Sequence, residues 1–585
     1  MQNFAAPRDN KKTQSNNIES VRHSLAHLLA AAVLKKFPTA KLGIGPNIED
    51  GFYYDFKLPK PISDSDLAEF EKTIRNFISQ KLDFSGEKIT PLKAKKLFKA
   101  QPFKLELIKD FTKEKKGLTS YSTGRIFVDL CRGGHVQNTS EINPGSFKLT
   151  KIAGAYWKGS EKNAQLTRIY GVAFQTKEEL DSHLKALEEA KKRDHKKLGQ
   201  ELDLFTFSDL VGAGLPLWTP KGTLLRDILD DFVWQLRNEK GYERVDIPHI
   251  TKKELYEKSG HWDKFKDELF IIETREGHIF AMKPMNCPHH TQIYARKQWS
   301  YRELPQRYAS TTKVYRDEQT GELAGLLRVR AITQDDAHVF CRPSQVKEEI
   351  FKIWDIISEF YGKFGFELSV RLSLHDPRHQ EKYLGTEKLW KESESVLREL
   401  VGARGIRAEE APGEAALYGP KIDFMGKDAL GRMHQVATIQ LDMNLPERFD
   451  LFCINEKGER ERVVMIHAAI MGSIERFLSV IIEHFAGAFP FWLSPVQVQI
   501  LTVTDRAINY ANEILGNLKS NNIRVATDFR NESIGKKIRE AELQKIPFIL
   551  IIGDKEVDAK KIAVRERGKG DLGQKTFEEF LDIAK

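Results

Sequence analysis

No single hydrophobic core can hold this chain. Hydrophobic cores stop growing beyond about 250–300 residues, and longer chains divide into domains. A chain of 585 residues therefore predicts three or four domains. Its composition is that of a folded protein, with 41% hydrophobic and 30% charged residues. The pattern of apolar residues along the chain indicates where the domains divide.

The N-terminal third divides into three segments. Residues 1–20 are polar, and we expect a disordered tail. Residues 21–175 mix short strands and helices; HSLAHLLAAAVLKKF has the apolar spacing of an amphipathic helix, and GRIFVDLCRGGH predicts a strand that enters a glycine-rich turn. Residues 176–203 carry leucines at helical spacing opposite a charged face, which predicts a connecting helix.

Two further segments complete the chain. Residues 204–491 alternate apolar strands with long charged helices, and the prolines of FPFWLSP mark the end of this domain. Residues 492–585 contain the strand-like segments VQVQILTV, IRVATDF, PFILIIG and IAVRER, separated by helical segments. We therefore expect a small α/β domain at the C-terminus.

Charge and cysteine content restrict the environment and the partners. The net charge of +9 fits a polyanionic partner, because basic side chains near phosphates release counterions. The four cysteines form no CxxC pair, which excludes a disulfide scaffold and fits a reducing compartment. No apolar run is long enough to cross a bilayer, and the first residues lack the apolar region of a secretory signal. We expect a cytoplasmic protein without membrane contact.

Two histidine-containing pairs within residues 21–175 predict a site. His23 and His27 are four residues apart on the predicted helix, so their side chains share one face. Cys131 and His135 are also four residues apart, in CRGGH, with Asp129 just upstream. Such a set of nitrogen and sulfur groups fits either a zinc site or a hydrolytic site. Spacing alone leaves both open, along with a structural role for each histidine.

The segments HSLAH, CRGGH and PGSFKLTKIAGAYWKG resemble the editing domain shared by threonyl- and alanyl-tRNA synthetases. The resemblance implies that these histidines and the cysteine activate water against mischarged tRNA, without a metal ion. Lys104 and Asp129 match further positions of that pocket. Gly134 stands where the family usually has proline, which loosens the turn before His135.

Three segments of residues 204–491 resemble the motifs of a class II aminoacyl-tRNA synthetase. They are LLRDILDDFVWQLRNEKGYERVDIPHI, KVYRDEQTGELAGLLRVRAITQDDAHVF and IMGSIERFLSVIIEHF, matching motifs 1, 2 and 3. The resemblance implies an antiparallel sheet flanked by helices and a dimer formed through motif 1. It places Arg316 on the α-phosphate of ATP, Glu318 on the adenine amino group and Arg476 on the γ-phosphate. No P-loop sequence GxxxxGK[ST] occurs.

Resemblance to threonyl-tRNA synthetases also implies one catalytic zinc ion. Cys287 in MKPMNCPHH, His338 in QDDAH and His467 in MIHAAIMGS match its ligands, although their spacing forms no local zinc signature. Three protein ligands leave a coordination position open for substrate. His289 stands where the family usually has glycine, beside the usual His290, so a competing nitrogen lies close to Cys287 in sequence.

Further residues of the catalytic domain match the family. Lys421 matches a position that contacts the ATP phosphates, and Arg328 lies along the motif 2 strands and joins the expected catalytic set. His261 matches a histidine proposed to assist the terminal ribose of tRNA. The positions that match contacts with threonine or the adenylate, or that lie beside them, are Gln334, Asp336, Tyr418, Gln435, Thr438, Gln440 and Ser473. For each of them, a packing role in the sheet is an equally good reading of the sequence.

The last domain resembles the anticodon-binding domain of the glycyl, histidyl, threonyl and prolyl enzymes. Asn531, Glu556 and Arg565 match positions that contact the threonine anticodon, and polar side chains at strand ends suit the reading of splayed bases. Lys536 and Lys537 would then face the tRNA backbone, with Arg539, unless they belong to an ordinary charged surface.

Together these resemblances predict a multidomain α+β threonine–tRNA ligase. It would use ATP with Mg²⁺, L-threonine and threonine tRNA, hold one Zn²⁺ per chain, form a homodimer and hydrolyse mischarged seryl-tRNA. Many family members begin with a small ubiquitin-like domain, and the residues before the editing half are too few for one, so we expect a form without it. The alternatives are a prolyl or seryl enzyme, or a paralogue that binds RNA without charging it. The HxxxH and CxxxH pairs, the Cys–His–His set and the motif arginines argue against both.

Overall fold

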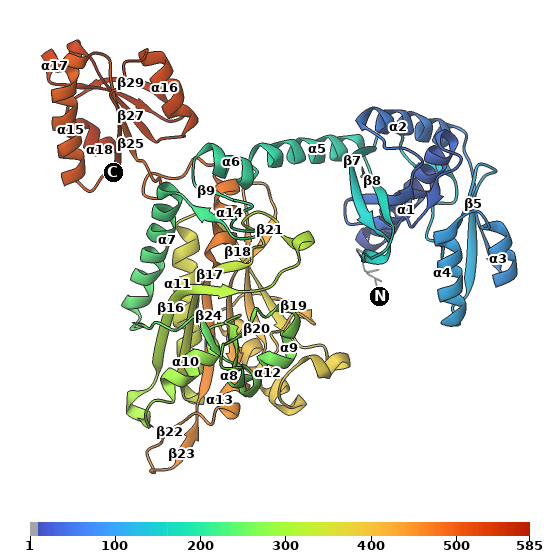
Figure 1. Ribbon diagram of the computed structural model, residues 1–585, viewed down its shortest axis with the longest axis horizontal. Coiled ribbons are helices and arrows are strands. Elements are labelled where there is room, and N and C mark those ends of the chain that lie inside the picture. Colours follow the sequence, from blue (N-terminus) through green and yellow to red (C-terminus); the bar gives the residue numbers. More distant parts are fainter. Residues whose placement is uncertain (1–9, 161, 585) are drawn as a thin grey trace, which may run out of the picture. The chain divides into compact units, whose positions relative to one another are not determined.

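The computed structural model describes residues 10–160 and 162–584 (Figure 1). The chain forms two compact units, one ending at Glu188 and the other beginning at Glu189. The family-based prediction of a mixed α+β protein with a largely antiparallel catalytic sheet is confirmed. No helix among the described residues combines the length and apolarity that a membrane-spanning segment needs.

Helix α1 (Asn10–Lys36) is the central element of the first unit. All of its residues from Leu25 to Val33 are buried, on every side of the helix, and His27 is the polar residue among them. The prediction of a one-sided amphipathic helix is therefore wrong. The disordered tail predicted for residues 1–20 also differs from the structure, because residues 10–20 are the first turns of α1. A helix extends into polar sequence once a packed segment has nucleated it. Residues 1–9 lie outside the described residues.

Two antiparallel sheets complete the first unit. The larger has the order β1-β3-β8-β7, with β2 paired to β3, and the smaller has the order β4-β5-β6. Helix α1 packs on the larger sheet through Phe52, Tyr54 and Phe56 of β3. The strands are β1 (Lys41–Leu42), β2 (Asn47–Ile48), β3 (Gly51–Lys57), β4 (Phe84–Ile89), β5 (Leu118–Thr123), β6 (Phe127–Leu130), β7 (Phe147–Tyr156) and β8 (Gln165–Ala173). The remaining helices are α2 (Asp64–Ser79), α3 (Pro91–Leu97) and α4 (Pro102–Lys113).

The predicted connecting helix is two helices. Helix α5 (Lys177–Lys192) ends before Asp194, and α6 (His195–Glu201) begins immediately after it. The Asp194 side chain accepts a hydrogen bond from the backbone N–H of Lys196 at 2.7 Å. An aspartate in this N-cap position starts a new helix, which explains the break in an otherwise continuous pattern.

An eight-stranded sheet forms the centre of the second unit, in the order β11-β16-β17-β24-β21-β20-β18-β19. Its pairs are antiparallel except for the parallel pairs β11–β16 and β18–β19 at its two edges. The central strands lie side by side in Figure 1, covered by apolar helix faces that include Ile350, Ile357 and Phe477. The strands are β11 (Glu243–Arg244), β16 (Gln306–Tyr315), β17 (Ala331–Cys341), β18 (Glu367–Leu374), β19 (Glu409–Pro412), β20 (Lys421–Lys427), β21 (Met433–Asp442) and β24 (Val464–Ser473). The helices used below are α7 (Pro220–Glu239), α9 (His261–Lys264), α10 (Cys287–Tyr294), α11 (Val346–Gly362), α13 (Asn444–Arg448) and α14 (Ile474–His484).

The C-terminal residues form a five-stranded sheet of order β26-β25-β27-β28-β29. The four strands expected from the sequence are present as β25 (Val498–Thr502), β26 (Val525–Asp528), β27 (Phe548–Ile552) and β28 (Ile562–Glu566). The fifth, β29 (Gly570–Lys575), has the sequence GDLGQK and gives no apolar alternation, so it was not expected. Helices α15 (Ile508–Ser520) and α16 (Ile534–Leu543) pack against β25.

Candidate functional site

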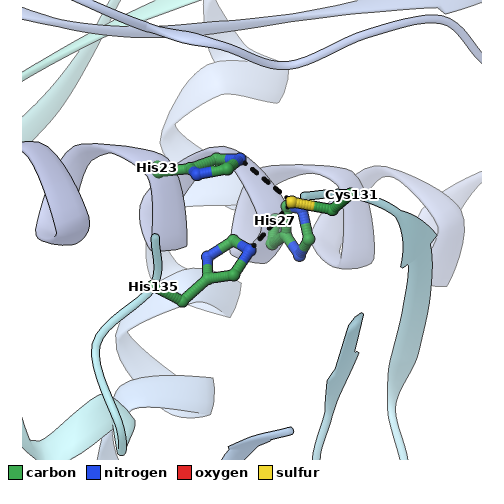
Figure 2. A group of neighbouring side chains, drawn as sticks. All are labelled: His23, His27, Cys131 and His135. Atoms are coloured by element: carbon green, nitrogen blue, oxygen red, sulfur yellow. Dashed lines mark hydrogen bonds between the residues drawn. The ribbon is translucent and has the colours of Figure 1, made fainter. Parts of the chain in front are cut away.

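Figure 2 shows three histidines gathered around one cysteine in the first unit. Helix α1 supplies His23 and His27, and the loop after β6 supplies Cys131 and His135. The Cys131 Sγ atom lies 3.5 Å from His23 Nε2 and 3.3 Å from His135 Nε2. Donor atoms of all four side chains lie within 4.8 Å of one another. The structure therefore brings together the two pairs that the sequence places far apart.

Burial sets the protonation of this cluster. It lowers the pKa of His135 to about 2, and lowers the pKa of His27 well below its ordinary value. Burial also raises the pKa of the Cys131 thiol to about 11. At neutral pH the cluster therefore contains a protonated thiol and neutral imidazoles, which suits the positioning of a water molecule better than thiolate attack.

Asp129 links the cluster to its surroundings. It lies on β6, where Lys104 Nζ contacts its Oδ1 at 2.5 Å and Tyr54 donates a hydrogen bond to its Oδ2 at 2.5 Å. His27 Nε2 lies 3.9 Å from the same Oδ2. Asp129, Lys104 and His27 border a cavity of about 490 Å³, together with Cys131 and His23, and the cavity is large enough for an amino-acyl group. The sequence identified Lys104 and Asp129 but missed Tyr54, which only the packing of β3 brings close.

The turn between Cys131 and His135 contains two glycines with positive φ. Gly133 has φ +99° and Gly134 has φ +87°, in the region that favours glycine. A Cβ atom on Gly133 would lie 2.4 Å from the hydroxyl oxygen of Tyr121. Glycine at position 134, where the family usually has proline, does not remove His135 from the cluster, because His135 Nε2 lies 3.3 Å from Cys131 Sγ.

A second cluster lies at the centre of the eight-stranded sheet. The register places His467 of β24 opposite His338 of β17 on one side and opposite Gln440 of β21 on the other. Cys287, the first residue of α10, completes a set whose donor atoms lie within 4.8 Å of one another. All of Cys287, His338 and His467 are buried. The structure thus brings together three residues for which the sequence carried no local signature.

Neighbouring side chains orient these histidines. Asp442 Oδ2 accepts a hydrogen bond from His467 Nε2 at 2.9 Å. His290 Nδ1 lies 2.8 Å from His338 Nδ1, and its Nε2 lies 3.2 Å from Ser310 Oγ. By contrast, neither ring nitrogen of the buried His289 has a hydrogen-bond partner among the described residues. Sequence reasoning missed Asp442, although its place two residues after Gln440 puts both on one face of β21.

Polar side chains expected to contact the amino acid surround this cluster. The Tyr418 ring stacks on His467 with centroids 4.5 Å apart, and its hydroxyl donates to Gln440 Oε1 at 2.6 Å. Thr438 Oγ1 accepts from Gln440 Nε2 at 3.4 Å. Asp336 accepts from Asn286 at 3.0 Å, and burial raises its pKa to about 6. His261 Nε2 lies 3.7 Å from Cys287 Sγ.

The residues expected to contact ATP lie on the same sheet or at its ends. Arg316 follows β16, and the Glu318 carboxylate receives a hydrogen bond from Arg328 Nε at 2.8 Å. Arg476 is exposed in the first turn of α14, whose N-cap Ser473 lies opposite Gln334 of β17. Lys421 and Gln435 both contact the buried Asp423 carboxylate, with Lys421 Nζ at 3.1 Å and Gln435 Nε2 at 2.9 Å.

The three expected anticodon contacts share no hydrogen bond or ion pair among the described residues. Asn531 is exposed in the loop after β26, Glu556 accepts from the Gly553 backbone at 3.0 Å, and Arg565 of β28 lies 3.4 Å from Glu542. The expectation that Lys537 faces a tRNA backbone is wrong. Lys537 is 2% exposed and donates to the Thr502 carbonyl at 2.9 Å, because the end of β25 needs a donor there.

Three protein-family models match the chain. The tRNA synthetase class II core domain (G, H, P, S and T) matches residues 270–485, and an anticodon binding domain matches residues 497–585. The threonyl and alanyl tRNA synthetase second additional domain matches residues 118–170. With the antiparallel sheet and its central cluster, these matches define a class II aminoacyl-tRNA synthetase.

Curated relatives give the particular family. A threonine–tRNA ligase of Gloeobacter violaceus is 47% identical over 576 residues, covering 97% of this chain and 91% of the relative. One of Azobacteroides pseudotrichonymphae is 49% identical, covering 96% and 87%. A crystal structure titled as the RNA binding domain of threonyl-tRNA synthetase from Cryptosporidium parvum Iowa II is 39% identical, with a TM-score of 0.63, over 67% of this chain and 97% of that one. The chain belongs to the threonine–tRNA ligase family.

Proposed function

We propose that this chain charges threonine tRNA with threonine and corrects its own errors. It activates L-threonine with ATP, transfers the threonyl group to the 3′-terminal adenosine of the tRNA, and hydrolyses mischarged seryl-tRNA elsewhere. The observation that carries the proposal is the buried Cys287, His338 and His467 set, which lies beside Tyr418 and Asp336 on a class II sheet. We assign editing to residues 21–175, aminoacylation to residues 204–491 and anticodon recognition to residues 492–585.

Adenylate formation uses ATP with Mg²⁺. The threonine carboxylate attacks the α-phosphorus, pyrophosphate leaves, and Arg316 and Arg476 bind the charge on the α- and γ-phosphates. Both contacts of Arg328 with Glu318 use Oε2, which leaves Oε1 for the adenine amino group. The terminal ribose hydroxyl of the tRNA then attacks the carbonyl carbon and AMP leaves. His261 lies next to Cys287, where it can orient that ribose.

The central cluster fits a zinc ion. Asp442 accepts from His467 Nε2, so His467 Nδ1 presents a lone pair. When His290 Nε2 donates to Ser310, His290 Nδ1 carries no proton and accepts a hydrogen bond from His338 Nδ1. The proton of His338 is then on Nδ1, so His338 Nε2 also presents a lone pair. These two nitrogens face each other at 3.0 Å. Two facing lone pairs repel unless a cation binds both, and a cysteine with two histidines is a zinc donor set.

The ligand set explains why two sites are needed. When bound, zinc would supply open coordination for an amino group and a hydroxyl, a pair that threonine and serine share and valine lacks. Serine lacks only the methyl group of threonine, and a missing methyl is worth about 1–3 kcal/mol of discrimination. Serine therefore enters the aminoacylation site at a biologically harmful rate, and a hydrolytic site must remove it.

The cluster in the first unit carries out that hydrolysis. His23, His27 and His135 are uncharged at neutral pH and hold a water molecule, with the Cys131 thiol beside them, against the seryl ester. Attack of this water on the ester carbon releases serine and free tRNA. The extra methyl of threonine excludes the correct product from the pocket.

We also assign a homodimer, formed through α7 and the strand that follows it, and a cytoplasmic location. Asn531, Glu556 and Arg565 lie in or beside the loops and strands of the C-terminal sheet, where they contact the threonine anticodon.

Amino-acid-dependent exchange of pyrophosphate into ATP tests the proposed function. Threonine should support the fastest exchange, serine should support slow exchange, and valine and proline should support none. Exchange that is fastest with another amino acid would refute the assignment, and exchange with none would favour a paralogue that does not charge tRNA.

A further inference from the structure

A buried histidine outside both clusters joins three segments of the second unit. His195 is the first residue of α6, and 2% of its surface is exposed. Its Nδ1 lies 2.7 Å from Glu483 Oε1, and its own backbone N–H donates to the same oxygen at 3.2 Å. On the other side of the ring, the backbone N–H of Leu326 donates to Nε2 at 3.2 Å. The imidazole therefore bridges a helix end and a loop.

The direction of these bonds follows from the partners. A backbone N–H can only donate, so Nε2 of His195 accepts and its proton lies on Nδ1. Nδ1 then donates to the Glu483 carboxylate, which is a charge-assisted hydrogen bond. Glu483 is held from its other side by Arg432, whose NH2 lies 2.6 Å from Oε2. Both ring nitrogens of His195 have a partner, so the ring has one orientation.

The two bridged segments both carry residues assigned to ATP. Leu326 lies in the loop between Arg316 and Arg328, where Leu327 N–H closes a turn onto Ala324 at 3.0 Å. Glu483 lies in the last turn of α14, whose first turn carries Arg476. A fixed distance between the loop and this helix therefore fixes the relative placement of the phosphate-binding arginines.

The loop fits closely against α6. Gly325 has φ +58°, and a Cβ atom there would lie 2.5 Å from His195 Nε2 and 2.9 Å from Lys196 Cε. The side chain of Leu326 is fully buried in the same apolar cluster as Leu198 of α6. A second residue of the connecting segment, Arg193, donates to the His484 carbonyl at the end of α14 at 3.0 Å.

We propose that His195 is a positioning residue for the ATP site, holding the loop of Arg316, Glu318 and Arg328 at a fixed place relative to α14. This inference rests on the proposed function for its ATP readout. His195 belongs to the segment that joins residues 21–175 to residues 204–491. This connecting segment therefore supports the nucleotide site as well as joining the two parts of the chain. His195 touches no substrate and acts only through the loop.

Two conservative variants separate the bonds of His195. In His195→Gln, the amide oxygen reaches the Leu326 N–H and replaces Nε2. In His195→Asn, the amide nitrogen replaces Nδ1 and donates to Glu483, but the side chain is too short to reach Leu326. We expect His195→Asn to raise the KM for ATP about fivefold, the worth of one hydrogen bond to a backbone amide, with the KM for threonine changed less than about twofold. His195→Gln keeps the bond to Leu326, and the backbone N–H of residue 195 still donates to Glu483, so its KM for ATP should stay within about twofold of wild type.

A matched control comes from His375, another buried histidine. Its Nδ1 lies 2.6 Å from Glu394 Oε1 and its N–H donates to the same oxygen, but its Nε2 has no partner among the described residues. In His375→Asn the amide nitrogen likewise replaces Nδ1 and donates to Glu394, and no bridge is removed. Its ratio of the two KM values should equal that of the wild type.

Amide hydrogen exchange of the purified full chain without ATP gives a readout independent of catalysis. The peptide containing residues 323–328 should exchange faster in His195→Asn than in wild type, His195→Gln and His375→Asn. Equal exchange and equal KM values in the Asn and Gln variants would overturn the inference, as would a parallel rise of both KM values. A wild-type protein without threonine-dependent pyrophosphate exchange would refute the proposed function instead. Amide hydrogen exchange would still decide the role of His195 in that case.

Discussion

The Asp442 carboxylate accepts a hydrogen bond from the His467 imidazole, with Oδ2 and Nε2 2.9 Å apart and both side chains buried. The same carboxylate accepts from the backbone N–H groups of Asn444 and Leu445 through Oδ1, at 2.8 and 3.0 Å. Asp442 therefore binds the first two backbone N–H groups of helix α13 and fixes the tautomer of a proposed zinc ligand.

Asp442→Asn should weaken zinc binding about 10- to 100-fold, the usual effect of losing such a partner. The asparagine oxygen can still cap α13, but its NH₂ group then faces His467 and moves the imidazole proton to Nδ1, away from the lone pair that zinc needs. Competition between the purified protein and a chelator measures the affinity. Asp428→Asn is the control, because Asp428 accepts from His434 at 2.9 Å in a similar pair away from the cluster. Equal zinc affinity of wild type and Asp442→Asn would show that this bond is only structural.

Gly134→Pro should reduce hydrolysis of seryl-tRNA by at least tenfold. Proline fixes φ near −65°, whereas Gly134 has φ +87°, so the turn must rearrange and displace His135. Gly134→Ala should have a smaller effect than proline, because its Cβ would meet only His23 Nδ1, at an ordinary 3.8 Å, and only the positive φ would strain the alanine. Deacylation of preformed seryl-tRNA measures the loss, and threonine-dependent pyrophosphate exchange serves as the control. A proline variant that hydrolyses at the wild-type rate would mean that the turn tolerates both conformations.

Local patterns predicted more of the fold than of the sites. Apolar spacing identified α1 and four strands of the last sheet, because each of these elements packs apolar side chains against a core. It failed for β29, whose glycine-rich sequence pairs at a sheet edge without an apolar face, and for the break at Asp194, where one cap residue overrides a helical pattern.

The sites depend on contacts between distant residues, which local patterns do not carry. His338 and His467 become neighbours only through the register of β17 with β24. Resemblance to a family identified them, but it did not reveal Asp442, Tyr54 or His195, which act on other side chains. Lys537 shows the opposite error, because a lysine in a basic cluster was expected on the surface and is instead buried against backbone carbonyls.

The rate of seryl-tRNA hydrolysis should change less than about twofold between pH 5.5 and 8.0, after subtraction of the uncatalysed rate. Burial lowers the pKa of His135 to about 2 and that of His27 well below the ordinary value, so both stay neutral as the pH falls to 5.5. Burial raises the pKa of Cys131 to about 11, so the thiol stays protonated as the pH rises to 8.0. A base with the ordinary histidine pKa of about 6.5 would lose roughly tenfold at pH 5.5. A profile with a midpoint near pH 6.5 would therefore place a solvent-exposed histidine in the rate-determining step.

The two activities should be separable by mutation, because their residues belong to different compact units. Arg316→Ala should abolish threonyl-adenylate formation and leave hydrolysis of preformed seryl-tRNA at the wild-type rate. The reason is that the role proposed for the guanidinium is on the α-phosphate of ATP, which takes no part in hydrolysis of the ester. Comparable loss of both activities in a folded Arg316→Ala protein would contradict the assignment of two independent sites.

The reciprocal variant, His23→Ala with His27→Ala, should accumulate seryl-tRNA. Threonine activation should remain near normal, because neither histidine belongs to the catalytic unit. The aminoacylation site can reject serine by only about 1–3 kcal/mol, or roughly 5- to 150-fold, so serine reaches the tRNA whenever hydrolysis stops. The measurement is the amount of serylated threonine tRNA that wild type and double variant produce with serine as the only amino acid. If the double variant makes no more seryl-tRNA than wild type while its threonine activation is intact, the histidines are structural or the aminoacylation site is more selective than the methyl argument allows. Serine-dependent pyrophosphate exchange distinguishes the two, because a more selective aminoacylation site fails to activate serine, whereas structural histidines leave serine activation detectable in both proteins.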